Sequence, residues 1–272
     1  MQLGLISSWD EKGFEEVAAH HLPKIEFCVN HNVPPADFTQ HLEEIRKYSK
    51  KYGVAVGSMG RWGAMRIRED GSIDPEKLEE DLTLIRAAAE LDCPVYNCGI
   101  NYIESRSYED NCRSAIDYLS KLLDCGRENG VKIAVYNCDW CNFIYEAKAW
   151  GVILSALPEL GIKYDVSHCM NRGGDYEKEM ADWGSRFYHF HLKGTLKLQG
   201  QPYHDPPAGM DQTNWGSVFA LLYRCRYNGM LSIEPHSGIW TGDRLFWAVE
   251  FTIKYMSQYI IPEDYRSPLL HQ

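Results

Sequence analysis

Two short stretches of the chain carry acidic and imidazole side chains at spacings that suit metal binding or proton transfer. In IKYDVSHC, Asp165 and His168 are three residues apart, where a short apolar run ends. In FYHFHLKG, His189 and His191 are two residues apart. Because successive side chains of a strand point to opposite faces, two residues at this spacing face the same side. Either histidine can therefore face a pocket only if its neighbour does so as well.

The rest of the chain alternates between strand and helix patterns, and this alternation predicts where the polar groups meet. Short apolar runs typical of buried strands occupy residues 3–7, 24–30, 54–60, 93–99, 131–137, 162–166, 187–193 and 230–235. Helical spacing of apolar residues, with Asp74 and Pro75 as one clear start signal, indicates helices over residues 14–22, 35–52, 75–91, 108–129, 142–157, 176–184, 215–226 and 244–259. Eight strands alternating with eight helices predict an α/β fold of the single (β/α)8 TIM barrel type.

The length of the chain agrees with one such barrel. The 272 residues contain no composition shift or low-complexity segment that would mark a second domain. We expect a barrel domain over residues 1–260 and a loosely held C-terminal tail over residues 261–272.

The composition of the chain argues against a nucleic acid partner and against insertion into a membrane. A net charge of -10 argues against a nucleic acid partner, because nothing in the chain would release counterions from a phosphate backbone. No apolar run is long enough for a membrane span, and the N-terminus lacks the basic and apolar regions of a signal peptide. Nine cysteines, most of them within strand or helix patterns, suit a reducing compartment, so a cytoplasmic protein is expected.

In a barrel of this type the active site lies where the strands' C-terminal ends meet the following loops. The predicted strand ends contribute Asp165, several histidines and, in MLSIEP, Glu234. Carboxylate and imidazole groups around one rim form a ligand set that Mn²⁺, Mg²⁺, Co²⁺ or Zn²⁺ accepts. Other rim residues are candidates for binding substrate: Trp9, Tyr136, Asn137, His168 and Lys193.

Four segments also carry a family resemblance: DVSH at 165–168, HFHLK at 189–193, GMDQTNW at 209–215 and NGMLSIEP at 228–235. Together they resemble the sugar phosphate isomerase/epimerase family of xylose isomerase-like barrels. The resemblance implies one divalent ion bound by a Glu, an Asp, a His and a Glu that end strands five to eight. Asp165, His191 and Glu234 match the last three, and His168 matches a histidine that contacts substrate oxygens in the ketose epimerases.

The fifth strand departs from this pattern. It reads AVYNCDW, so Tyr136 or Asn137 stands where the family has its first Glu. In the ketose epimerases the two Glu residues act as paired bases, so symmetric two-base epimerisation is in doubt here. An Asn137 carbonyl, a water molecule or Asp139 could complete the ligand set. The additional histidines of the nuclease branch of the family are missing, which argues against phosphodiester hydrolysis.

These observations predict a divalent-metal-dependent isomerase or epimerase of a small keto sugar or related polyol, working through an enediolate. Glu234 would be the base at the carbon, and His168 would position the substrate oxygens. Two alternatives remain open: a lyase or dehydratase at the same site, for which one base suffices, and a sugar-binding protein without activity. The substrate's identity and phosphorylation and the metal stay undetermined, and a homo-oligomer is possible.

Overall fold

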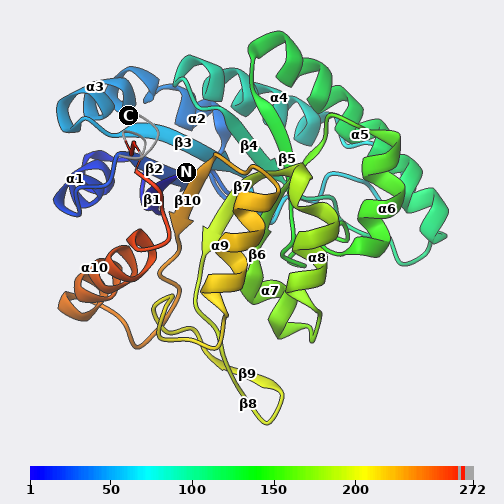
Figure 1. Ribbon diagram of the computed structural model, residues 1–272. Coiled ribbons are helices and arrows are strands. Elements are labelled where there is room, and N and C mark those ends of the chain that lie inside the picture. The colour runs from blue at the N-terminus through cyan, green and yellow to red at the C-terminus, as the bar shows by residue number, and fades with distance from the viewer. Residues whose placement is uncertain (263–264, 267–272) are drawn as a thin grey trace.

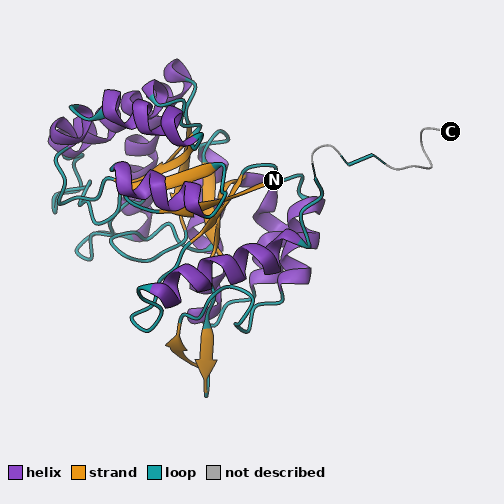
Figure 2. Ribbon diagram, turned by 90° about the vertical axis from the view of Figure 1, so that its left-hand side faces the viewer, coloured by secondary structure: helices purple, strands orange, loops and turns teal. Residues whose placement is uncertain are grey.

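The chain folds into a closed barrel of parallel strands surrounded by helices, as the computed structural model of residues 1–262 and 265–266 shows (Figures 1 and 2). The barrel strands are β1 (Gln2–Ile6), β2 (Lys24–Cys28), β3 (Ala55–Gly60), β4 (Val95–Cys98), β5 (Lys132–Tyr136), β6 (Gly161–Asp165), β7 (Phe187–Leu192) and β10 (Met230–Ile233). Neighbouring strands pair in the order β1-β10-β7-β6-β5-β4-β3-β2, and β2 closes the ring on β1. The predicted (β/α)8 barrel is confirmed.

The helices occupy the outside of the barrel and the loops at its rim. They are α1 (Glu11–Ala19), α2 (Pro35–Thr39), α3 (Leu42–Tyr52), α4 (Pro75–Glu90), α5 (Tyr108–Asn129), α6 (Ala147–Ala156), α7 (Val166–Asn171), α8 (Tyr176–Trp183), a short 3-10 turn (Gly184–Arg186), α9 (Trp215–Arg224) and α10 (Asp243–Ser257). A hairpin of β8 (Leu196–Leu198) and β9 (Gln201–His204) stands out from the rim in both overall views (Figures 1 and 2).

Two local predictions were wrong, and two elements were not predicted. The helix predicted over residues 35–52 is two helices, α2 and α3, with a break at Gln40 and His41. The helix predicted from Asn142 begins only at Ala147. The Asn142 side chain instead ties the loop together, since its oxygen accepts from the amides of Ile100 and Ile144. Neither α7 nor the β8–β9 hairpin was predicted.

The apolar core lies between the strands and the helices, whereas the interior of the barrel carries polar side chains. Fully buried Trp150 and Phe190 belong to the apolar core. Glu26 of β2 and His189 of β7 are equally buried, and these strands are not neighbours in the sheet, so the two side chains meet through the barrel interior. Interiors of such barrels are usually filled by branched apolar residues. This polar filling positions the site described below.

The predicted division into a barrel over residues 1–260 and a tail over residues 261–272 stays a prediction, because most of the tail lies outside the described residues. Within the described part of the chain, no helix combines the length and apolar character needed to cross a bilayer.

Candidate active site

Asp165, His191 and Glu234 meet at the C-terminal end of three neighbouring strands. Asp165 ends β6 and pairs in register with His191 of β7, and Glu234 directly follows β10. One ligand atom from each of the three lies within 4.8 Å of the other two. Asp165 Oδ2 is buried and has no hydrogen-bond partner among the described residues. Two carboxylates and an imidazole, with one carboxylate oxygen still without a partner, form a ligand set that suits a divalent cation.

The backbone around Asp165 is held by Asn137, which follows β5. Asn137 Nδ2 donates to the Asp165 carbonyl oxygen at 2.8 Å, and its side-chain oxygen accepts from the Asp165 amide at 2.9 Å. Asp165 Oδ1 accepts from the amide of Ser167 at 2.8 Å, which starts α7 and leaves Oδ2 for a ligand. Asn137, a predicted substrate-binding residue and candidate fourth ligand, thus uses its side chain to join two strand ends.

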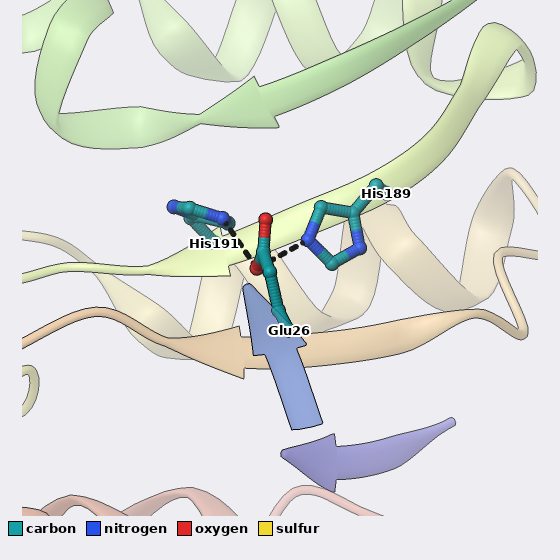
Figure 3. A group of neighbouring side chains, drawn as sticks. All are labelled: Glu26, His189 and His191. Carbon is teal, nitrogen blue, oxygen red and sulfur yellow. Dashed lines mark hydrogen bonds and ion pairs between the residues drawn. The ribbon is translucent and has the colours of Figure 1, made fainter. Parts of the chain in front are cut away.

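Glu26 of β2 orients His191 from across the barrel. Figure 3 shows its carboxylate between the rings of His189 and His191, whose Nε2 atoms lie 2.7 and 2.8 Å from the same oxygen, Oε2. When His191 carries its proton on Nε2 and donates it to Glu26, the unprotonated Nδ1 keeps a free electron pair that can bind a metal ion. Nδ1 lies 2.8 Å from Glu234 Oε2, on the side of the candidate metal ligands. A carboxylate behind a ligating histidine fixes its tautomer in many metal sites.

The charges around His191 favour its protonated form when no cation is bound. Burial alone would lower its pKa, but the carboxylates of Glu26 and Glu234 raise it above the ordinary value. A protonated ring would donate to both acids. Binding of a cation on the Nδ1 side would release this proton, because a metal ligand must offer a free electron pair.

His168 lies in α7, three residues after Asp165, with Nε2 at 3.5 Å from Asp165 Oδ2. Burial and the charges of Lys163 and Lys193 outweigh the opposing effect of Asp165 and lower the pKa of His168 to about 4. Its ring is therefore neutral at pH 7 and can exchange hydrogen bonds with hydroxyl groups. His168 and Asn137 also line an open cavity of about 540 Å³ beside the ligand set.

The remaining predicted substrate residues lie at different places around the rim. Tyr136 is fully buried and stacks on Trp62, with ring centroids 4.9 Å apart. The ring of Trp9 packs against Phe38 at 5.5 Å. Lys193 is buried, with Nζ at 3.9 Å from Asp205 Oδ2. Their roles in substrate binding stay predictions.

Neither Lys163 nor Glu26 is among the site residues predicted from the sequence. Lys163 is in β6, two residues before Asp165, and is 2% exposed. Alternation along the strand was an available signal, because it places Lys163 on the same face as Asp165. For Glu26 the face depended on the register of β2, which the sequence alone did not settle.

Comparison with known proteins identifies the family and the fold. A family model described as xylose isomerase-like TIM barrel matches residues 13–252. Similar solved structures include the IolI protein with a bound zinc atom (15% identity, 96% of this chain and 99% of that one, TM-score 0.76). Others are D-psicose 3-epimerase with D-tagatose from Clostridium cellulolyticum H10 (14%, 95% and 99%, TM-score 0.75) and 3-keto-D-glucoside 4-epimerase YcjR from E. coli (13%, 95% and 99%, TM-score 0.72). No curated protein sequence matches the chain.

Proposed function

The chain belongs to the xylose isomerase-like TIM barrel family, and from this premise we propose that it is a divalent-metal-dependent isomerase or epimerase of a small keto sugar or related polyol. The observation that carries the proposal is the convergence of Asp165, His191 and Glu234 at one point of the rim. The sugar epimerases among the similar structures support the substrate class.

A divalent ion held by these three residues would supply Lewis-acid polarisation of the substrate's carbonyl and neighbouring hydroxyl. Glu234 is the proposed base. Burial would raise its pKa, but the charges of Lys193 and His191 hold it well below the ordinary value, so the group is a carboxylate at neutral pH. One of its oxygens contacts His191, and the other can take a proton from the substrate carbon. Neutral His168 is placed to hold the substrate's hydroxyl groups.

The side chains of Tyr136 and Asn137 offer no second base. The Asn137 side chain is used on the Asp165 backbone, and the Tyr136 hydroxyl lies 3.4 Å from the Trp140 carbonyl oxygen. With one carboxylate, a proton taken from one carbon is returned from the same side to the neighbouring carbon of the enediolate. This favours isomerisation by a shift of the carbonyl between neighbouring carbons over two-base epimerisation. It is equally compatible with a lyase or dehydratase, which needs one base.

The test is turnover on a panel of ketoses and aldoses, with the protein stripped by chelator and then reloaded with Mn²⁺. We expect activity only in the reloaded protein, and a loss of about 10²-fold or more in Glu234→Gln and Asp165→Asn. Glu159→Gln is the matched control, because Glu159 is an exposed acid paired with Arg127. Full turnover in both site variants would refute the assignment. A product lighter by one water molecule would identify the lyase or dehydratase instead.

A further inference from the structure

Two lysines with buried side chains face the candidate ligand set. Lys163 precedes Asp165 by two residues on β6, and Lys193 follows His191 by two residues at the end of β7. Alternation along a strand therefore points each lysine to the same side as a proposed ligand. Lys163 is 2% and Lys193 6% exposed.

The Lys163 ammonium group lacks a polar partner. Among the described residues it makes no hydrogen bond and no ion pair within 4.0 Å, and Nζ lies 5.9 Å from the centroid of the Trp62 ring. The stem of Lys163 is buried, but Nζ is not among the fully buried side-chain atoms that lack a partner, so the ammonium group keeps contact with solvent. A ligand on the solvent side can therefore supply the acceptor that the described residues do not.

The position of Lys163 is specified by the sheet. The register between β6 and β7 shifts between Ile162 and Lys163, and irregularities of this kind re-aim side chains near active sites. On its other side, Lys163 pairs with Tyr136 of β5. Its charge is therefore beside the strand that lacks the family's first Glu.

Lys193 brings a second positive charge to the same place. Its one ion pair, with Asp205 at 3.9 Å, is too long for a hydrogen bond. The strands β6 and β7 pair in register, Lys163 with His189 and Asp165 with His191. The two lysines are therefore carried by the same adjacent strands as two of the proposed ligands.

We propose that Lys163 and Lys193 bind a carboxylate of the substrate, so that the enzyme acts on a keto acid of the sugar series and not on a neutral ketose. This inference rests on the proposed function and names its substrate class. The substrate's carboxylate would lie beside β5. It would supply there the negative charge that Tyr136 and Asn137 do not provide. A carboxylate fits better than a phosphate because Lys163 lies next to the reacting groups, within reach of an acid on the carbon beside the carbonyl.

The test compares two probes that differ at one carbon, 2-keto-D-gluconate and D-fructose, by isothermal titration calorimetry with the full chain loaded with Mn²⁺ and again without metal. We expect the keto acid to bind about tenfold more tightly than the ketose in the loaded protein, as charge-assisted hydrogen bonds require. Lys163→Gln and Lys193→Gln should each remove most of this preference. Lys121→Gln, which changes an exposed lysine of α5, should keep it.

Equal binding of the two probes by the wild-type protein, or an unchanged preference in both site variants, would overturn the inference. Tighter binding of D-fructose 6-phosphate than of the keto acid would assign the lysines to a phosphate and overturn it as well. If Lys163→Gln does not fold, the wild-type comparison still decides. Protection of Lys163 from reductive methylation by the keto acid, read by mass spectrometry, gives a second measurement. Metal-dependent turnover of a neutral ketose without a keto acid preference would refute this inference alone and leave the proposed function standing.

Discussion

Glu26 is one carboxylate that serves two histidines of the opposite wall of the barrel. Its Oε2 contacts His189 and His191, while its other oxygen, Oε1, is buried without a partner among the described residues. Burial would raise the pKa of Glu26, but the two histidines hold it well below the ordinary value. The group therefore remains charged and keeps His191 turned towards Asp165 and Glu234.

This arrangement predicts that Glu26→Gln weakens metal binding without removing a ligand. The amide keeps the shape of the side chain but loses the charge that orients His191, and loss of such a supporting group costs about 10–100-fold in metal affinity. Titration of the chelator-treated protein with Mn²⁺ measures the change. Glu159→Gln should bind Mn²⁺ as the wild type does. Wild-type affinity in Glu26→Gln would show that His191 needs no orienting carboxylate.

The sequence predicted which side chains meet at the strand ends, but it did not predict which side chains meet across the interior of the barrel. Asp165, His191 and Glu234 each end a predicted strand, so their approach followed from the fold. The contact of Glu26 with His189 joins strands that are far apart in the sheet, and it depends on a register shift at Glu26 that no local pattern encodes. Lys163, by contrast, shares a face with Asp165 through regular alternation along β6, so its position could have been predicted from the sequence.

Among the elements, α4 illustrates a helix start that local chemistry determines. Asp74 accepts hydrogen bonds from the amides of Glu76 and Lys77, and Pro75 occupies the first position. Asp74→Ala should lower stability by about 1 kcal/mol, whereas Asp74→Asn keeps an acceptor and should cost less. Thermal unfolding of the three proteins at pH 7 gives the comparison, and equal melting temperatures would contradict it.

The charge of Asp74 adds a pH dependence to the same helix start. Burial alone would raise its pKa. Arg68 and the helix amides lower it by more than that, so the folded-state pKa is depressed. The group contributes stability above its unfolded pKa of about 3.9, and this contribution is lost as the pH falls through the folded value. The stability difference between wild type and Asp74→Asn should therefore shrink on acidification below pH 4. A constant difference would mean that the charge has no part in the cap.

Helix ends were predicted well where a capping residue marked them, and poorly elsewhere. The predicted bounds of α5 are confirmed, because Ser107 caps its start and Gly130 takes the left-handed conformation after its end. The break between α2 and α3 has no glycine or proline to announce it. The β8–β9 hairpin forms within a loop rich in turn residues, where the three-residue strand β8 is too short for a periodic signal.

Across the whole molecule, a buried ionic network joins the loop after β3 to β4, α4 and α5. Asp81 of α4 accepts from two nitrogens of Arg66, at 2.6 and 3.1 Å, and from the hydroxyls of Tyr96 and Tyr118 at 2.7 and 2.8 Å. All four residues are fully buried. Arg66 also donates to the carbonyl oxygen of Gly99 at 2.8 Å, so one charge pair connects four consecutive parts of the barrel wall.

Asp81→Asn should therefore destabilise the whole barrel by about 3–5 kcal/mol, because it leaves the Arg66 guanidinium buried without a countercharge. Glu79→Gln is the matched control on the same helix. It breaks the exposed ion pair with Arg86 at 2.9 Å and should cost less than about 1 kcal/mol. Urea unfolding followed by tryptophan fluorescence measures both, and the midpoint should fall strongly in Asp81→Asn alone. A cost no larger than that of Glu79→Gln would show that water or a rearranged Arg66 satisfies the charge, and that the network does not hold this half of the barrel together.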